Sequence, residues 1–133
     1  MQNRSTIALS VLLALSLGGC ANLSRSEKIM LRELGSHGIR PTDQKAKHPA
    51  VAGALNILPG FGNFYLAAGT EESEQWLYGF LNLLAWPLSI VWGIPEAAID
   101  ANTINKRETV YYYMFDPTGK KELQSLRSSR GYH

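Results

Sequence analysis

The sequence predicts a mainly α-helical, membrane-associated protein built around a hydrophobic helical hairpin. Hydrophobic residues make up 45% of the 133 residues and charged residues 18%. The hydrophobic residues concentrate in three blocks: 7–17, 49–69 and 76–99. No charged side chain lies between Lys47 and Glu71 when His48 is counted as neutral, and none lies between Glu74 and Glu96. Each of these two intervals has about 20 residues or slightly more, which is the length that an α-helix needs to cross a hydrocarbon core.

The first residues have the organisation of an export signal. A short basic start at residues 1–4 precedes an apolar run at residues 7–17 that is too short to span a bilayer comfortably. The run ends in Leu17-Gly18-Gly19-Cys20. This tetrapeptide resembles the bacterial lipoprotein box, which has an aliphatic residue and two small residues before a cysteine. The resemblance implies that residues 1–19 are a lipoprotein signal peptide and that Cys20 carries covalent lipid, including palmitate-type acyl chains.

Lipid on Cys20 is the only cofactor-like group that we expect. One acyl chain holds a protein on a membrane only reversibly, whereas several chains make attachment effectively permanent, since each buried CH₂ contributes about 0.8 kcal/mol. Cys20 is the only cysteine, so the chain forms no internal disulfide and no cysteine-based metal cluster. An ordinary secretory signal that contains a cysteine stays open as the alternative.

The predicted location is the cell envelope, on a membrane and facing the periplasm. Ala21 follows the cysteine where inner-membrane lipoproteins of enterobacteria have an aspartate. This leans weakly toward the outer membrane, and an inner-membrane location stays open.

Four segments follow from these patterns. They are a signal peptide at 1–19, a polar tether with a short helix at 20–47, the hydrophobic helical hairpin at 48–105 and a polar tail at 106–133. Within the tether, Ser26 is expected to cap a short helix that runs through Gly35, before Gly38 and Pro41 break it. This helix fits either a membrane-surface role or a linker. The histidines of this region have no other metal-ligand types at suitable spacing, so no metal site is expected.

The two apolar intervals form the hairpin, with the acidic tract 71–74 as its tip. Pro59 cannot donate a backbone hydrogen bond, and Gly60 and Gly62 loosen the helix around it, so we expect a break there. Such a break is tolerable at membrane depth only if protein or water satisfies the freed backbone groups. Small residues such as Gly53 permit close helix contact. Trp86 lies in the middle of the second interval and is expected to pack against the first helix.

The hairpin also carries a family resemblance. The run Leu55-Asn-Ile-Leu-Pro-Gly-Phe-Gly-Asn-Phe-Tyr-Leu66 precedes a second apolar segment that ends Val91-Trp-Gly-Ile-Pro-Glu-Ala-Ala-Ile-Asp100. This arrangement resembles the small two-transmembrane-helix domain family over less than half of the chain. Phe64 and Tyr65 match the family's aromatic pair, and Trp92 and Asp100 match its terminal pair. The resemblance implies a hairpin of two transmembrane helices and no assigned chemistry.

The topology of the hairpin stays open among three geometries. If Cys20 is lipidated on the periplasmic side, a hairpin that crosses the membrane puts its acidic tip in the cytoplasm. Its basic flanks, such as Lys47 and Arg107, then lie outside, against the positive-inside tendency. The hairpin either spans the membrane against this rule, dips into one leaflet without crossing, or folds as an apolar helical core, alone or in an oligomer.

The tail is expected to be a short strand followed by a helix. Residues 108–115 are rich in β-branched and aromatic types, including Tyr111, Tyr112 and Tyr113, and predict one strand. Residues 116–119 predict a turn, and residues 120–127 a short helix.

The sequence favours a non-enzymatic protein. Glu96 and Asp100 lie one helical turn apart and are the only acid–base candidates, although carboxylates at the edge of an apolar segment usually just reach water. The net charge of +2 is too small for a nucleic-acid partner. We therefore expect a lipid-anchored membrane protein of the cell envelope with a structural, assembly or partner-binding role through its hairpin.

Two alternatives remain open. One is an oligomeric pore or transport accessory, whose polar path is lined by Asn56, Asn63, Asn82 and Glu96. The other is a small envelope enzyme that uses Glu96 and Asp100. The expected partners are membrane lipid and either a second copy of the chain or another membrane protein.

Overall fold

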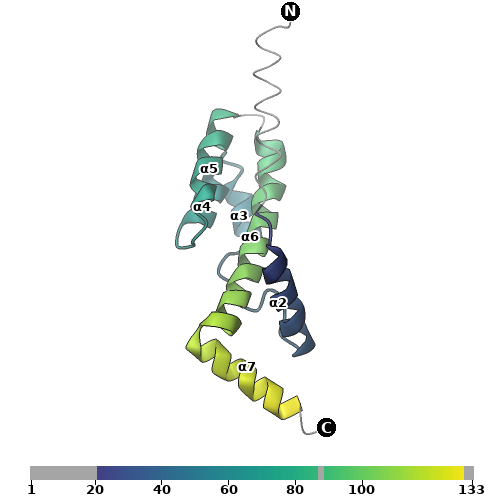
Figure 1. Cartoon of the computed structure of the whole chain (residues 1–133). Coiled ribbons are helices and arrows are strands. Elements are labelled where there is room, and N and C mark those ends of the chain that lie inside the picture. The colour runs from purple at the N-terminus through teal and green to yellow at the C-terminus, as the bar shows by residue number, and fades with distance from the viewer. Residues whose placement is uncertain (1–20, 87–88, 131–133) are drawn as a thin grey trace, which may run out of the picture.

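The computed structural model describes residues 21–86 and 89–130, and this part of the chain is helical without a strand. Cys20 and the proposed signal peptide 1–19 lie outside the described residues. The described helices are α2 (Arg25–Ser36), α3 (Pro49–Leu55), α4 (Phe61–Ala67), α5 (Glu74–Leu84), α6 (Ser89–Phe115) and α7 (Pro117–Arg130) (Figure 1). The predicted mainly α class is thus confirmed.

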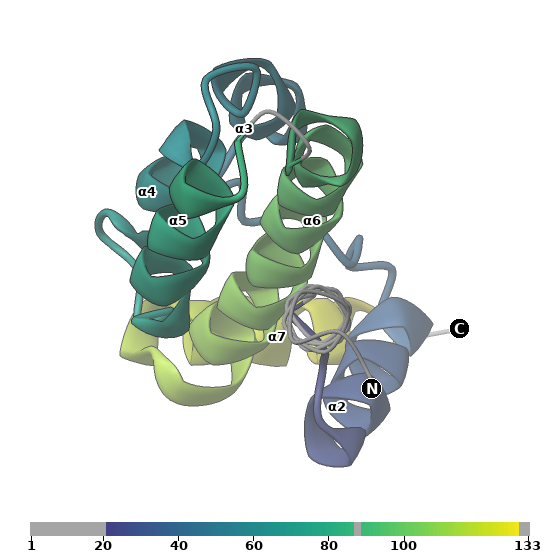
Figure 2. The same cartoon turned by 90° about the horizontal axis from the view of Figure 1, so that it is seen from above.

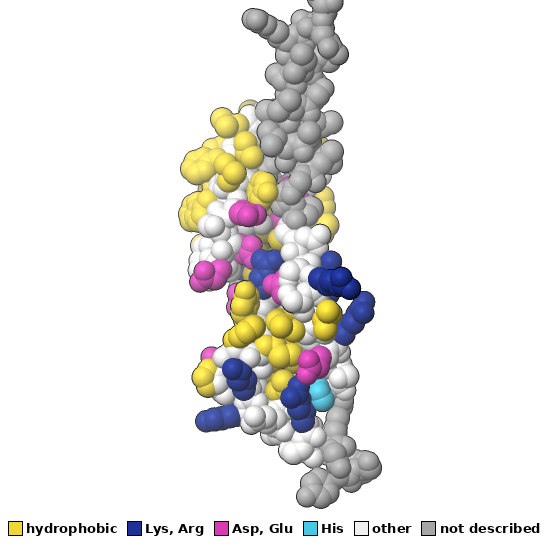
Figure 3. Space-filling view, in the orientation of Figure 1, with side chains coloured by type: hydrophobic (Ala, Val, Ile, Leu, Met, Phe, Trp, Pro, Cys, Tyr) yellow, Lys and Arg dark blue, Asp and Glu magenta, His cyan; other side chains and the backbone are white. Residues whose placement is uncertain are grey.

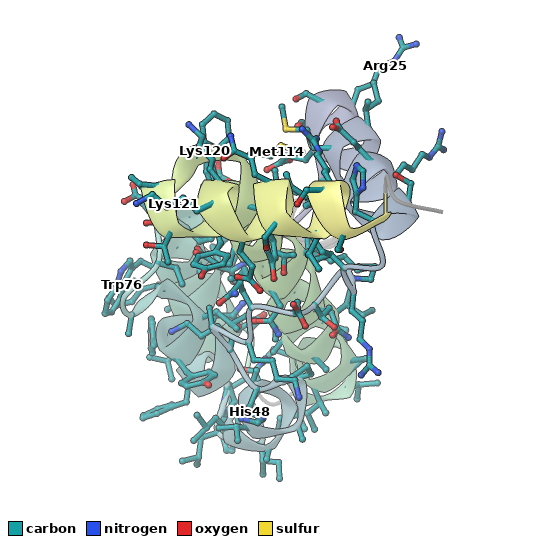
Figure 4. All side chains as sticks on the ribbon, turned by 90° about the horizontal axis from the view of Figure 1, so that it is seen from below. Arg25, His48, Trp76, Met114, Lys120 and Lys121 are labelled. Carbon is teal, nitrogen blue, oxygen red and sulfur yellow. The ribbon has the colours of Figure 1, made fainter. Side chains whose placement is uncertain are left out.

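Helix α6 is the axis on which the other helices pack (Figures 1 and 2). Its N-terminal part contacts α3, α4 and α5, and together they form what we call the hairpin unit, residues 49–105. The buried apolar side chains of this unit are Ala52, Leu66, Ala97, Ala101 and Ile104. The C-terminal part of α6 contacts α2 and α7, around a second core of Leu34, Ile39, Val110, Tyr113 and Leu123. Helix α7 lies across the end of the molecule that is opposite the start of α6 (Figures 1 and 4).

Helix α2 confirms the short helix predicted in the tether, with a different cap. The Ser24 hydroxyl accepts a hydrogen bond from the Glu27 N–H at 3.2 Å, and the Glu27 carboxylate accepts one from the Ser24 N–H at 2.6 Å. This reciprocal capping box satisfies two backbone donors, so the helix begins before the predicted cap at Ser26. The helix ends at Ser36, shortly before Gly38, whose φ of 81° is readily adopted only by glycine.

The break predicted at Pro59 and Gly60 is confirmed. Helix α3 ends at Leu55, and α4 begins at Phe61 after Gly60, which has a φ of 85°. A Cβ at Gly60 would overlap the carbonyl oxygen of Gly79, so only glycine lets the start of α4 pack directly on α5. The first predicted hairpin helix is therefore two short helices that fold back on each other.

None of the described helices combines the length and the hydrophobicity required to cross a membrane. The apolar interval before the acidic tip is divided between α3 and α4. The interval after the tip is divided between α5 and the start of α6.

The predicted C-terminal strand is wrong, because residues 108–115 form the last two turns of α6. Val110 and Tyr113 are three residues apart, and both are buried in the core with α2 and α7. The helical spacing of these contacts overrides the β-propensity of the valine and tyrosines. The predicted helix in the tail is confirmed as α7. It is capped by the Asp116 carboxylate, which accepts hydrogen bonds from the N–H groups of Thr118 (2.7 Å) and Gly119 (3.3 Å).

Candidate functional site

A line of hydrogen bonds between buried polar side chains runs through the hairpin unit. The Asn82 amide donates to the Asn63 side-chain oxygen at 2.9 Å, and the Asn63 amide donates to the Gln75 side-chain oxygen at 2.9 Å. The Gln75 amide in turn donates to one Asp100 carboxylate oxygen at 2.8 Å. The backbone N–H of Ala21 donates to the other Asp100 oxygen at 2.8 Å. We call these five residues the amide line.

The amide line has the burial of a protein core. Asn63 and Asp100 are fully buried, Gln75 is 2% exposed and Asn82 is 7% exposed. Buried polar groups are costly unless they are hydrogen-bonded, and here each side chain has a partner within the line. The line therefore fixes α4, α5, α6 and the first described residue of the chain relative to one another.

Asn56 supplies the protein contacts that the helix break requires. Its side-chain oxygen accepts from the N–H groups of Gly60 at 3.0 Å and Gly62 at 3.1 Å, and its amide donates to the Gly93 carbonyl at 2.5 Å. Asn56 is 1% exposed. The backbone donors of Gly60 and Gly62, next to Pro59, are thus satisfied inside the protein.

The carboxyl group of Glu96 lies one helical turn from Asp100, the carboxylate of the amide line. Burial raises the pKa of Asp100, against the opposing effect of the hydrogen bonds from Gln75 and Ala21. Burial, and then the nearby charge of Asp100, raises the pKa of Glu96 to about 7. Glu96 is 8% exposed and has no hydrogen-bond partner among the described residues. Near neutral pH, the protonated and the ionised forms of Glu96 are therefore both populated.

Apart from the acidic tip, the outward surface of the hairpin unit is mainly apolar. Its exposed large side chains come from α3, α4, α5, α6 and their connections: Val51, Leu55, Ile57, Leu58, Phe61, Trp76, Leu77, Phe80, Leu83, Leu84, Trp86, Val91 and Ile99. We call this set the apolar surface. The ring of Phe64 lies 5.4 Å from those of Trp76 and Phe80, centroid to centroid. Trp86 is 63% exposed, so the prediction that it packs against the first helix is wrong.

A cluster centred on Arg107 joins the hairpin tip to the rest of the molecule. The Arg107 Nε donates to the Glu27 carboxylate at 2.7 Å, and its Nη2 donates to the Asn22 carbonyl at 3.0 Å. Its Nη1 also pairs with the Glu72 carboxylate. We call these four residues the Arg107 cluster. Because Glu72 belongs to the acidic tip, the tip and the basic flank of the hairpin lie side by side in this structure.

Lys47, just before α3, joins the start of the hairpin unit to α4 and α6. Its backbone N–H and carbonyl both bond to the Asn105 side chain, at 2.8 and 2.7 Å. Its Nζ donates to the Tyr65 carbonyl at 2.7 Å and also to the Ala68 carbonyl at the end of α4, and it lies 4.7 Å from the centre of the Tyr65 ring. The Tyr65 hydroxyl accepts from the His48 N–H at 3.1 Å. Burial lowers the pKa of Lys47.

The structure brings several sequence-selected residues together within the chain. A Cβ at Gly53 would lie 3.3 Å from the Ile94 carbonyl oxygen, and one at Gly62 would overlap Asn56. These glycines therefore serve contacts between helices of the same chain. Trp92 lies on α6 within this unit, and its indole N–H has no acceptor among the described residues.

Sequence reasoning did not select Gln75 as a site residue. It named Arg107 as a basic flank of the hairpin but did not predict its contacts. The signal for Gln75 was a seven-residue spacing of polar residues in an apolar background, at 75, 82, 89 and 96. Seven residues are close to two helical turns, so this spacing places Gln75 and Asn82 on one side of α5, and Ser89 and Glu96 on one side of α6.

Within the described residues, the carboxyl groups of Glu96 and Asp100 belong to no metal-ligand group. The described residues contain no group of three or more metal-ligand side chains. One open hollow of about 370 Å³ is described, lined by Gln44, Lys45, Ala46, Glu108, Tyr111, Tyr112 and Asp116. Glu96 and Asp100 do not line it.

Comparison with known proteins adds no relative. No protein-family model, no curated protein and no solved structure matches this chain.

Proposed function

We propose that this chain is a lipid-anchored membrane protein of the bacterial cell envelope that faces the periplasm. Its role is structural: it assembles with, or binds, a partner at the membrane through the hairpin unit. The observation that supports this most is the hydrogen bond between the Ala21 N–H and the buried Asp100. Ala21 directly follows Cys20, the residue that we propose to carry the lipid.

This hydrogen bond gives the lipid a defined point of attachment. A lipoprotein with a long free tether leaves its folded part free to move away from the membrane. Here the residue next to the proposed lipid is held by Asp100 of α6, in the same hairpin unit that carries the apolar surface. Several acyl chains at this point would keep the hairpin unit against the membrane permanently.

The two alternative functions have less support. The amides proposed to line a pore, Asn63 and Asn82, are bonded to each other inside the unit, and Asn56 is bonded to backbone groups. For an enzyme, Asp100 has both oxygens engaged by neighbours and is fully buried. No specific observation favours either function over the anchored role.

The direct test is metabolic labelling with an alkyne analogue of palmitate in a Gram-negative host. The wild-type chain should become labelled, and mass spectrometry should find the lipid on an N-terminal Cys20. Cys20→Ser should abolish labelling. An unlabelled wild-type chain contradicts the proposal.

A matched control tests whether lipid attachment requires the lipoprotein box or only the presence of a cysteine. The double variant Cys20→Ser/Ser125→Cys keeps one cysteine but moves it to an exposed position on α7. It should take up no lipid. Density-gradient separation of the labelled membranes then distinguishes the outer membrane, toward which Ala21 leans, from the inner membrane.

A further inference from the structure

We propose that the hairpin unit is embedded in a single leaflet of the bilayer, with the apolar surface against lipid chains and the Arg107 cluster at the headgroups. This inference rests on the proposed function for the identity of the membrane. Three features of the molecule favour lipid as the partner: the polarity of the hairpin unit, the distribution of the apolar surface and the depth of the unit.

The hairpin unit combines a small apolar core with buried polar side chains and an apolar outward surface, which is unusual for a water-soluble fold. Its interior contains the amides and carboxyl groups of the amide line, while its outward side chains are leucine, isoleucine, valine, phenylalanine and tryptophan. Exposure of apolar surface to water costs about 25 cal/mol of free energy per Å², whereas contact with lipid chains avoids this cost. Contiguous apolar surfaces of this kind mark a membrane or a protein interface.

The distribution of the apolar surface favours lipid over one protein partner. Exposed apolar residues occur on α3 (Val51), α4 (Phe61), α5 (Phe80) and α6 (Val91), rather than on one helix face. A second copy of the chain would cover one side of the unit and leave the others in water. A leaflet surrounds all of them at once.

The depth of the unit matches one leaflet. Helix α6 rises about 16 Å from Asp100 to its start at Ser89, at 1.5 Å per residue. The hydrocarbon core of a bilayer is about 30 Å thick, so half of it is about 15 Å. Because Asp100 holds Ala21, the proposed lipid attachment lies at the lower end of this rise. The acyl chains and the hairpin unit would thus enter the same leaflet from the same level.

The charged side chains mark the level of the headgroups. Residues 49–70 and 75–95 contain no charged residue. Figure 3 shows hydrophobic side chains gathered at the end formed by α5 and the start of α6, and the lysines and arginines of this face in the other half. Trp76 lies beside Gln75 at the start of α5 and points outward in Figure 4, as expected for an aromatic ring at the interface.

The experiment uses the full-length lipidated protein. In it, Cys20 is occupied as a thioether and does not react with maleimides, so Leu84→Cys introduces one labelling position. Leu84 is 83% exposed, and a label there replaces no packing contact. Ser125→Cys on α7 is the matched control. Each variant is labelled with an environment-sensitive fluorophore and reconstituted in vesicles of phosphatidylethanolamine and phosphatidylglycerol.

In vesicles, we expect the Leu84 label to shift to the blue. Nitroxides on lipid acyl chains should quench it several-fold more than they quench the Ser125 label. Aqueous iodide should quench the Ser125 label and leave the Leu84 label largely unaffected. Quenching of the Leu84 label by iodide in vesicles would overturn the inference. The inference would also be overturned if no lipid nitroxide quenched the Leu84 label and the unlabelled Leu84→Cys variant formed a disulfide-linked dimer in the same vesicles.

The outcomes of this experiment and of palmitate labelling distinguish a failure of leaflet insertion from a failure of the proposed lipid anchor. If Cys20 carries lipid and iodide reaches Leu84, the anchored function stands and leaflet insertion is wrong. The double variant Cys20→Ser/Leu84→Cys, labelled at position 84 and purified in detergent, is added to the same vesicles. If lipid nitroxides still quench its label, insertion does not depend on the anchor and the inference stands without it.

Discussion

At the scale of single residues, a few polar side chains in an apolar background determine how the hairpin unit packs. The sequence placed Asp100 at the end of an apolar segment and paired it with Glu96 by helical spacing, and that spacing is present in α6. Its partners Gln75 and Ala21 lie 25 and 79 residues away in the chain. Contacts at such separations depend on how the helices pack, and no local pattern encodes them.

The first prediction concerns Asp100. Asp100→Ala leaves the buried Gln75 amide and the Ala21 N–H without an acceptor, and each unpaired donor costs about 1–3 kcal/mol. The free energy of unfolding, measured by denaturant titration in mild detergent, should fall accordingly. Glu74→Ala, which removes an exposed carboxylate, should change it by about 0.5 kcal/mol or less. Equal effects of the two variants would contradict the assigned role of Asp100.

The second prediction concerns Glu96 and pH. Its pKa rises from 4.5 to about 7 on folding, chiefly through burial, so the folded state binds more protons than the unfolded state between these values. The stability that Glu96 contributes is complete below about pH 4.5 and is lost as the pH rises through about 7. The free energy of unfolding of the wild type, measured by denaturant titration at a series of pH values, should therefore fall as the pH rises over this range. Glu96→Gln should flatten the profile, leaving the part due to Asp100, and an unchanged profile would contradict the burial of Glu96.

At the scale of elements, the sequence predicted what local signals encode. The helix α2, the break at Gly60 and the helix α7 follow from caps, glycines and prolines, which act on their immediate neighbours. Residues 108–115 were misassigned because their β-propensity is local, whereas the buried contacts that make them helical come from α2 and α7. The subdivision of the apolar intervals into short helices depends on Asn56, whose role as an internal partner for the backbone could not be read from its position.

The third prediction compares two glycines with positive φ. Gly60→Ala and Gly69→Ala both place a side chain in the left-handed region, which costs about 1–2 kcal/mol. A Cβ at Gly69 has open space, whereas one at Gly60 overlaps the Gly79 carbonyl. Gly60→Ala should therefore destabilise by an additional 1–3 kcal/mol, approximately, from overpacking. Thermal unfolding of the two variants tests this, and equal midpoints would show that α4 does not pack on α5 in this way.

At the scale of the whole molecule, the Arg107 cluster is the feature that the sequence left open. The sequence left three hairpin geometries open, one of them against the positive-inside tendency. The contact between Glu72 and Arg107 brings the tip back to its own flank. Lipid on Cys20, a tip beside this flank and an apolar surface around the hairpin unit are consistent with one another in the leaflet geometry. The sequence could predict the apolar intervals but not their folding onto α6, because that depends on long-range polar contacts.

The fourth prediction tests this cluster. Arg107 is 21% exposed and contacts three partners, whereas the ion pair of Arg127 with Glu33 is 44% and 48% exposed. Arg107→Ala should lower the free energy of unfolding by about 2 kcal/mol or more, since hydrogen bonds to charged groups contribute 1.5–3 kcal/mol each. Arg127→Ala should lower it by about 1 kcal/mol at most. Similar losses in both variants would mean that the tip is not held by Arg107.

The most direct test of the whole account is the accessibility of two engineered cysteines in cells. Ser73→Cys lies in the acidic tip and Ser125→Cys on α7, and both positions are exposed. After the outer membrane is permeabilised, a membrane-impermeant maleimide is added, with the wild-type chain and known periplasmic and cytoplasmic proteins as controls. The account predicts that both cysteines are labelled without disruption of the inner membrane, because tip and tail lie on the same side. Labelling of Ser125→Cys with full protection of Ser73→Cys would mean that the hairpin crosses the membrane, and would contradict it.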